Sequence, residues 1–306
     1  MLKKPIIIDT DPGIDDAVAL ALALFSKELD VKLITTVVGN VSLEKVTRNT
    51  LQLLTFYGKN IPVAAGARKP LLRQAFDASS VHGDSGLGAY RFPDFQDTNL
   101  LEQHAVVAMY NTIINSDSPV TLVPIGPLTN IALLLTMFPD IKPQIKEIIL
   151  MGGAIGRGNS GIYSEFNITI DPEAADIVMN SGLTITMVPL EIGRKALVFP
   201  EDALKIKEMH SIGDMFYKLF KTYRGGSFNT GLKMYDGSAI AYLLKPELFT
   251  TQKAFVAVET KGDFTSGATI IDLQGNLGKD ANVTVATDIN PDEFKKWFME
   301  TIEKCV

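Results

Sequence analysis

Four aspartates occur within eight residues near the start of the chain, in the segment Asp9-Thr10-Asp11-Pro12-Gly13-Ile14-Asp15-Asp16. Carboxylates this close repel one another unless a cation or a shared proton lies between them. Oxygen ligands of this kind suit hard divalent cations, so Ca²⁺ and Mg²⁺ are the favoured partners. The segment therefore predicts a metal-binding or catalytic site.

Two simpler interpretations of these aspartates fit less well. Acidic residues are favoured in the first turn of a helix, but capping accounts for one or two of the four, not for all. An EF-hand loop also carries regularly spaced carboxylates. It requires a glycine where this chain has Ile14 and a glutamate where it has Leu20. The metal or catalytic interpretation is therefore preferred.

The neighbouring elements place these carboxylates at one edge of a sheet. The apolar run 5–8 predicts a short buried strand, and the run 17–25 predicts the buried helix that follows it. In open α/β sheets, ligands bind at the carboxyl ends of the strands. Asn40 follows another predicted strand at 31–38, so it should reach the same edge.

Strand-like and helix-like segments alternate through most of the 306 residues. Such alternation predicts an α/β fold built on a mostly parallel open sheet with helices on both faces. We see no linker, repeat or low-complexity segment, so we expect residues 1–306 to form a single domain. Two glycine-rich segments, 65–97 and 152–164, should be loops, and the first is long enough to suggest function. Residues 253–287 turn β-rich before a closing amphipathic helix at 291–305.

The composition argues against several classes of protein. A net charge of −6 without a Lys/Arg-rich stretch disfavours a nucleic-acid partner. Cys305 is the only cysteine, and the three histidines lack ligand-like spacing, which disfavours disulfides and a zinc centre. Asp9 and Asp11 interrupt the first apolar stretch, so no signal peptide is visible, and no charge-free run reaches the roughly 20 residues of a membrane span. We therefore expect a cytoplasmic protein without a membrane partner.

Other polar residues could join the aspartates. Glu165 and Asn167 precede a helix that Asp171 should cap, which leaves both free for a substrate. His82 lies between small residues of the first loop, where a histidine either faces solvent or serves a site. Asp236 enters a predicted helix and would by default be its N-cap.

These segments together resemble the inosine-uridine-preferring nucleoside hydrolase family. The resemblance extends in order over nearly the whole chain, through Asp9–Ala17, Thr35–Asn40, His82–Gly86, Gly126–Asn130, Leu150–Gly153 and Glu165–Asn167. The first segment is close to the signature of that family and is highly specific. The resemblance implies the nucleoside hydrolase fold, with a Rossmann-like core.

The resemblance also implies an enzyme that hydrolyses the N-glycosidic bond of ribonucleosides to ribose and free base. Cleavage builds positive charge on the ribose in an oxocarbenium-like transition state, which a carboxylate-rich pocket stabilises. The implied cofactor is one Ca²⁺ per chain, which lowers the pKa of the attacking water. The implied partners are a ribonucleoside and further copies of the chain, in a homodimer or homotetramer, and the implied role is nucleoside salvage.

Position by position, the resemblance implies a set of site residues. The carboxylates of Asp11, Asp16 and Asp236 should hold the Ca²⁺, together with the backbone carbonyl of Ile125. Asp11 should also be the general base, and His82 should face the base of the nucleoside. The expected substrate-binding residues are Asp15, Asn40, Met151, Asn159, Glu165, Phe166, Asn167 and Phe228.

The chain departs from the family at Tyr235. Well-studied members have a histidine directly before the last metal-binding aspartate, and that histidine is thought to protonate the departing purine. A tyrosine, with a reference pKa of about 10, is a weaker proton donor at neutral pH. Its ring can still stack on the base or its hydroxyl can hydrogen-bond there. Tyr223 and Arg224 could compensate from the segment that should flank the base.

Two alternatives remain open. A haloacid-dehalogenase-like phosphatase also begins with a strand that ends in Asp-x-Asp, with Asp9 as nucleophile and Mg²⁺ as metal, although no convincing downstream lysine or second acidic pair is evident. The chain could otherwise be a catalytically weak nucleoside- or ribose-binding protein, with Tyr235 marking the loss of the acid.

Overall fold

Side chains of the first strand, β1 (Lys4–Thr10), alternate between two hydrophobic cores. Ile6 and Ile8 belong to one core and Ile7 to the other, and all three are buried. Successive side chains of a strand point to opposite faces, so a strand covered on both faces is a continuous apolar run. The central sheet is therefore packed on both sides.

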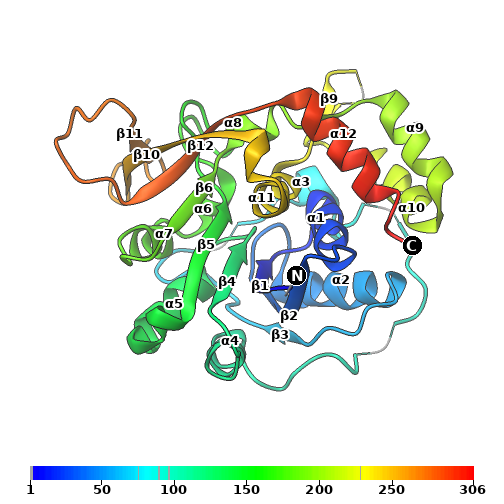
Figure 1. Cartoon of the computed structure of the whole chain (residues 1–306), viewed down its shortest axis with the longest axis horizontal. Helices are drawn as coiled ribbons and strands as arrows, with labels where there is room; N and C mark the ends of the chain where they lie inside the picture. The colour runs from blue at the N-terminus through cyan, green and yellow to red at the C-terminus, as the bar shows by residue number, and fades with distance from the viewer. Residues whose placement is uncertain (1–2, 75, 89, 96, 228) are drawn as a thin grey trace.

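The computed structural model describes residues 3–74, 76–88, 90–95, 97–227 and 229–306. Its largest sheet has nine strands in the order β11-β10-β12-β6-β5-β4-β1-β2-β3 (Figure 1). Besides β1 these are β2 (Leu29–Thr36), β3 (Val63–Ala65), β4 (Val120–Pro124), β5 (Ile145–Met151), β6 (Ile185–Val188), β10 (Phe249–Val258), β11 (Thr269–Asp272) and β12 (Val283–Ile289). A small sheet contains β7 (Leu197–Val198), β8 (Gly226–Ser227) and β9 (Gly231–Lys233).

The helices complete the layers on either side of the sheet. The core on one face includes side chains of α1 (Ile14–Leu24), α10 (Ser211–Phe220), α11 (Tyr235–Leu244) and α12 (Pro291–Ile302), and the core on the other includes α4 (Ala105–Ile114), α5 (Thr129–Met137) and α7 (Pro172–Met179). The remaining helices are α2 (Leu43–Phe56), α3 (Ser79–His82), α6 (Phe166–Ile170), α8 (Leu190–Gly193), α9 (Pro200–Met209) and the 3₁₀ segments η1 (Pro139–Gln144) and η2 (Pro246–Leu248). No described helix is long and apolar enough to cross a membrane.

The expected mostly parallel open sheet is confirmed. In the described part of the nine-stranded sheet, neighbouring strands pair in parallel from β3 through β2, β1, β4, β5 and β6 to β12. The two pairs that β10 forms in this sheet are antiparallel. The strand β1 lies between β2 and β4, so the chain order of the strands reverses beside it. Ligands of open α/β sheets bind outside the carboxyl ends of the strands at such a switch point.

Local predictions were confirmed in part. Asp171 caps α7 as expected, and its carboxylate accepts from the backbone N–H of Ala174. Asp236 was expected to be the N-cap of its helix, and this prediction was wrong. The helix α11 begins at Tyr235, so Met234 is the N-cap and Asp236 lies within the first turn. The first predicted loop, 65–97, contains the helical turn α3, which ends at His82.

Candidate active site

A cavity of about 380 Å³ lies at the carboxyl ends of β1, β4 and β5. Most of the predicted site residues meet there although they are far apart in the sequence. The lining residues are Asp11, Asp15, Asn40, Ala78, Val81, His82, Ile125, Met151, Asn159, Glu165, Phe166, Asn167, Tyr223, Arg224, Gly225, Lys233, Tyr235 and Asp236. Of the remaining two predicted residues, Asp16 belongs to the carboxylate cluster beside this lining, and Phe228 lies outside the described residues.

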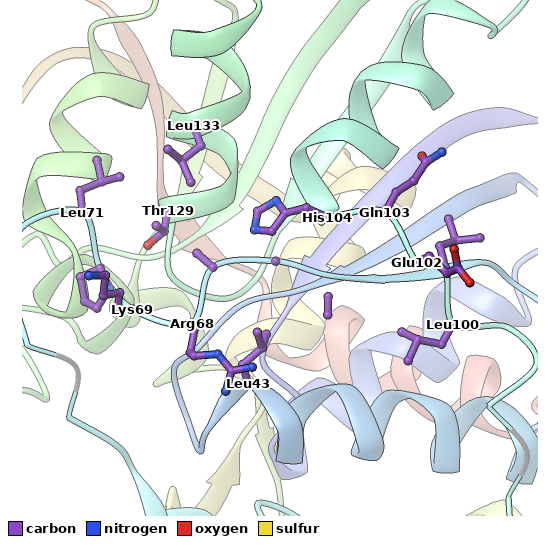
Figure 2. Close-up of a pocket in the computed structure, with 15 residues that line it drawn as sticks. Leu43, Arg68, Lys69, Leu71, Leu100, Glu102, Gln103, His104, Thr129 and Leu133 are labelled. Atoms are coloured by element: carbon purple, nitrogen blue, oxygen red, sulfur yellow. The ribbon is translucent and has the colours of Figure 1, made fainter.

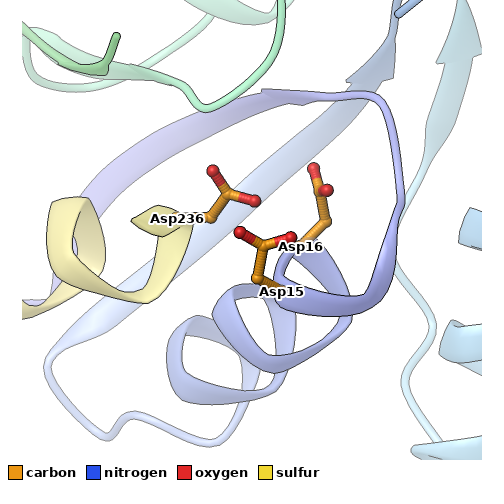
Figure 3. Close-up of side chains that lie close together, drawn as sticks. All are labelled: Asp15, Asp16 and Asp236. Atoms are coloured by element: carbon orange, nitrogen blue, oxygen red, sulfur yellow. The ribbon is translucent and has the colours of Figure 1, made fainter. Parts of the chain in front are cut away.

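Three buried carboxylates converge beside this cavity (Figure 3). Asp15 and Asp16 lie in the first turn of α1, and Asp236 lies in the first turn of α11. Each offers an oxygen within 4.8 Å of an oxygen of the other two. Because α1 and α11 pack against each other, the tertiary fold unites residues that are about 220 positions apart.

Asn40 joins the two halves of the aspartate-rich segment. Its backbone N–H donates to Asp11 Oδ2 at 2.6 Å, and its side-chain Nδ2 donates to Asp16 Oδ2 at 3.1 Å. Asp16 also accepts from the Thr10 hydroxyl at 2.7 Å and from the backbone N–H of Gly13 at 2.9 Å. The carboxylates are thus oriented by donors that come from the same sheet edge.

Burial raises the pKa values of these carboxyl groups, and repulsion between neighbouring carboxylates adds to the rise for Asp11, Asp15 and Asp236. Desolvation is the largest cause for Asp11, Asp15, Asp16 and Asp236, and the pKa of Asp15 rises to about 8. Among the described residues, no lysine or arginine forms an ion pair with any of the four. Buried carboxylates without a basic partner are stabilised by a shared proton or by a bound cation, so this group has the property of a cation site.

His82 lines the cavity and is held by the first turn of α1. Its Nδ1 accepts from the backbone N–H of Ile14 at 3.0 Å and lies 4.0 Å from Asp15 Oδ1. Burial lowers the pKa of His82 to about 4, so the ring is neutral near pH 7. A Cβ atom on residue 13 would lie 2.5 Å from Nδ1, which explains the glycine there.

Glu165 and Asn167 connect the cavity to the ends of β4 and β5. Glu165 caps α6 and accepts from the backbone N–H groups of Asn167 and Gly153. Burial raises the pKa of Glu165 to about 7. Asn167 Nδ2 donates to the carbonyl oxygens of Ile125, at 2.9 Å, and Met151, at 3.2 Å, which leaves its Oδ1 for the cavity.

Tyr235, which lines the cavity, packs on a glycine outside the lining. A Cβ atom on residue 193 would lie 2.1 Å from Cδ1 of Tyr235, so Gly193 makes room for the ring. Burial raises the pKa of the Tyr235 phenol. Tyr223 and Arg224 also line the cavity.

The cavity lining includes four residues that were not predicted from the sequence, namely Ala78, Val81, Gly225 and Lys233. Lys233 ends β9 and lies two residues before Tyr235, the first residue of α11, so the change from strand to helix places both at the cavity. Nothing in the sequence pattern distinguished Ala78 and Val81.

Asp9 lies below the cavity rather than in it. Its Oδ1 accepts from the Thr35 hydroxyl at 2.6 Å and from Asn130 Nδ2 at 2.8 Å, and the residue is 1% exposed. Burial raises the pKa of Asp9 to about 7. A phosphatase nucleophile must reach its substrate, and Asp9 does not line the cavity, so its position argues against the haloacid-dehalogenase-like alternative.

A larger cavity, about 640 Å³, lies beside the edge strand β3 (Figure 2). Its lining includes Arg68, which forms an ion pair with Glu44, and His104, whose Nδ1 accepts from the backbone N–H of Val106 at the start of α4. The ion pair and the helix cap stabilise the fold, and none of the three clustered aspartates lines this cavity. Size alone therefore does not identify the site.

The chain matches the sequence pattern of the family described as inosine-uridine preferring nucleoside hydrolase over residues 6–296. It is 50% identical over 301 residues to the non-specific ribonucleoside hydrolase RihC of Escherichia coli O127:H6, a match that covers 98% of this chain and 99% of that protein. It is also 50% identical over 303 residues to RihC of Escherichia fergusonii, which covers 99% of both chains.

Solved structures agree with the sequence matches. The purine-preferring ribonucleoside hydrolase from Gardnerella vaginalis superposes with a TM-score of 0.91 at 30% identity, over 99% of both chains. An inosine-guanosine nucleoside hydrolase superposes with a TM-score of 0.92 at 28% identity, also over 99% of both chains. The arrangement of sheet and helices is therefore shared over the full length of these proteins.

Proposed function

The chain belongs to the inosine-uridine preferring nucleoside hydrolase family, and on that premise we propose that the carboxylate-lined cavity at the end of β1 is its active site. The protein is a ribonucleoside hydrolase, which splits the N-glycosidic bond with water to yield ribose and free base. The observation that carries the site assignment is the convergence of Asp15, Asp16 and Asp236 in one buried group at the switch point of the sheet. Asp11 lines the same cavity and is linked to Asp16 through Asn40.

The donor set fits a hard divalent cation, which we propose to be Ca²⁺. Asp11, Asp16 and Asp236 would hold it through carboxylate oxygens, and the carbonyl of Ile125 would add a further oxygen. That carbonyl already accepts from Asn167, and its second lone pair is free for a cation. When bound, the ion supplies positive charge that polarises water and ribose hydroxyls.

Asp11 acts as the general base in this proposal. Asn40 donates to its Oδ2 and orients the carboxylate, so the remaining oxygen can take the proton of the attacking water. The water oxygen forms a bond to C1′ of the ribose as the bond from C1′ to the base nitrogen breaks. The bonding electrons leave with the base.

The same carboxylates stabilise the reaction electrostatically. Positive charge develops on the ribose ring as the base departs, and fixed negative groups in a buried site favour it. The ribose hydroxyls donate to the acceptors that the cavity offers, namely Asp15, Glu165 and the side-chain oxygens of Asn40 and Asn167. Asn159 completes the ribose side from the rim, and Met151 and Phe166 pack beside the sugar.

The base side of the cavity offers neutral hydrogen-bond donors. His82 accepts through Nδ1, so its proton lies on Nε2 and can be donated to an acceptor atom of the base. The Tyr235 hydroxyl, with its raised pKa, stays protonated and is a second donor. Hydrogen bonds from both groups stabilise the negative charge that develops on the departing base, and we assign them as catalytic residues.

Release of ribose from inosine, adenosine, uridine and cytidine tests this function, with and without a chelator selective for Ca²⁺. We expect release that the chelator abolishes and that added Ca²⁺ restores. Tight nucleoside binding without release would instead support the binding-protein alternative. If Mg²⁺ restored activity and Ca²⁺ did not, the assignment of Ca²⁺ would be wrong, but the proposed hydrolysis would stand.

The assembly and location of the protein are also proposals. We propose a cytoplasmic homodimer or homotetramer of chains in which residues 1–306 fold as a single domain. Analytical ultracentrifugation measures the assembly, and one cooperative unfolding transition is expected for a single domain.

A further inference from the structure

Glu191 of the short helix α8 and Arg194, the C-cap residue of that helix, hold the backbone of the loop that follows β5. Glu191 Oε2 accepts from the backbone N–H of Ile155 at 2.9 Å, and its Oε1 accepts from that of Gly156 at 3.1 Å. Arg194 Nη2 donates to the carbonyl oxygens of Arg157, at 2.5 Å, and Gly158, at 3.4 Å. Four consecutive residues are thus bound from one element.

Glu191 and Arg194 also bind each other, with 3.2 Å between Arg194 Nη1 and Glu191 Oε1. Their side chains are 24% and 35% exposed, so solvent only partly screens the pair. Hydrogen bonds in which one partner is charged are shorter and stronger than neutral ones. We call Glu191 and Arg194 the α8 brace.

The residue directly after the braced backbone is Asn159, on the rim of the cavity. Its Oδ1 accepts from the backbone N–H of Phe166 at 2.9 Å, and its own N–H donates to Ser164 at 3.0 Å. The side-chain oxygen is therefore engaged, and the NH₂ group is the end that can serve a substrate. The backbone of residues 155–158 leads directly into Asn159, so a shift of that backbone can move the group.

We propose that Glu191 and Arg194 are positioning residues that act on the ribose through Asn159. The inference rests on the proposed function of the cavity, since Asn159 must contact a ribose hydroxyl for the brace to matter. Neither brace residue lines the cavity, so their effect on the reaction is indirect. A displacement of about 1 Å in such a group is enough to lower activity substantially.

Inosine and its 2′-, 3′- and 5′-deoxy analogues test the proposal. Asn159→Ala should lower kcat/KM for every substrate except one, the analogue that lacks the hydroxyl contacted by Asn159. The unaffected analogue therefore identifies that hydroxyl. Arg194→Gln and Glu191→Gln should reproduce this pattern, with a loss of about tenfold in kcat/KM on inosine and less than about twofold on that analogue. Arg194→Lys should recover part of the loss, because it keeps the charge but not the planar fork.

A double-mutant cycle separates positioning from general damage. If Arg194 acts through Asn159, Arg194→Gln should have almost no further effect in the Asn159→Ala background. Lys195→Gln is the matched control, because Lys195 is the neighbouring cation and pairs with Asp288, at 2.6 Å, instead of the loop. Lys195→Gln should leave the kcat/KM values on inosine and its deoxy analogues unchanged.

Equal losses on all four substrates, or additive effects of Arg194→Gln and Asn159→Ala, would overturn the proposal. A wild-type protein that releases no ribose would contradict the proposed function instead. In that case, calorimetric binding of the same four nucleosides to the same variants decides whether the brace acts through Asn159.

Discussion

His82 Nδ1 accepts a hydrogen bond from the backbone N–H of Ile14, 3.0 Å away. Ile14 is the first residue of α1, and the next two are Asp15 and Asp16. The bond satisfies one of the N–H groups that lack a partner at a helix start. The same imidazole therefore stabilises the turn that carries two site carboxylates and keeps its other nitrogen for the cavity.

Two amide substitutions should separate these roles of His82. His82→Asn places an amide oxygen near the position of Nδ1 and removes the Nε2 donor, so we expect near-normal stability and a loss of about tenfold or more in kcat/KM. His82→Gln places its amide near Nε2 and loses the cap, so we expect a decrease of about 1 kcal/mol in the free energy of unfolding. Urea unfolding and ribose release measure the two effects.

Equal stability losses for both substitutions would show that the hydrogen bond to Ile14 is unimportant. Nitrogen NMR of the ring gives an independent check, because the assigned tautomer has its proton on Nε2.

Asp11→Asn should reduce turnover by about 10²- to 10⁴-fold, because it removes the proposed base and one negative charge from the cation site. Calorimetry should show weaker Ca²⁺ binding as well. Asp117→Asn is a matched control, since Asp117 is exposed and far from the cluster in sequence. Appreciable turnover by the Asp11 variant would disprove the assigned mechanism.

Tyr235→His should raise the turnover of purine nucleosides relative to pyrimidine nucleosides, by about tenfold or more, if a stronger acid for the base is what the site lacks. The measurement is kcat for inosine and uridine. An unchanged or lower ratio would show that the tyrosine hydroxyl has a role of its own.

Gly193→Ala should test how Tyr235 is held. A methyl group there collides with the tyrosine ring, so we expect a loss of about 1–3 kcal/mol in stability together with lower activity. Combining the substitution with Tyr235→His should reduce this loss, because an imidazole is smaller. Fully additive unfolding free energies would contradict the contact.

Arg73→Gln should destabilise the protein near pH 7 but not in acid. Arg73 binds both carboxylate oxygens of Glu173 and also the carbonyl of Thr260, and its hydrogen bonds lower the pKa of Glu173 below the usual 4.5. A lowered pKa in the folded state gives stability that is present above the unfolded value and lost as the pH falls through the folded value. We expect a difference of about 1 kcal/mol at pH 7 that shrinks below pH 4.5.

Urea unfolding of wild type and variant between pH 3 and pH 8 measures this dependence, at roughly one-unit steps. Lys32→Gln provides a control, since Lys32 pairs with Asp30 on the surface and should contribute less than about 0.5 kcal/mol. A pH-independent difference for Arg73→Gln would mean that the bond to Thr260 dominates.

The local order of the chain was readable from its sequence. The apolar runs around Asp9–Asp16 predicted both β1 and α1, because burial on both faces of a sheet requires continuous apolar residues. The alternation of strands and helices predicted the parallel sheet, and the parallel sheet predicted which edge would bind a ligand. Asp171 was recognised as a helix cap because capping depends on a few neighbouring residues.

Contacts between distant segments were decided only by the tertiary structure. Nothing near Asp9 in the sequence indicates that its carboxylate meets Thr35 and Asn130 below the cavity and not within it. The collision that makes Gly193 necessary exists only because Tyr235 packs on it, and the brace from Arg194 to Gly158 joins residues 36 positions apart. Sequence patterns report backbone preference and burial, which are local. The charge states of the buried carboxylates, the tautomer of His82 and the position of the loop at 155–158 depend on distances between elements. Those distances are set by how whole helices and strands pack.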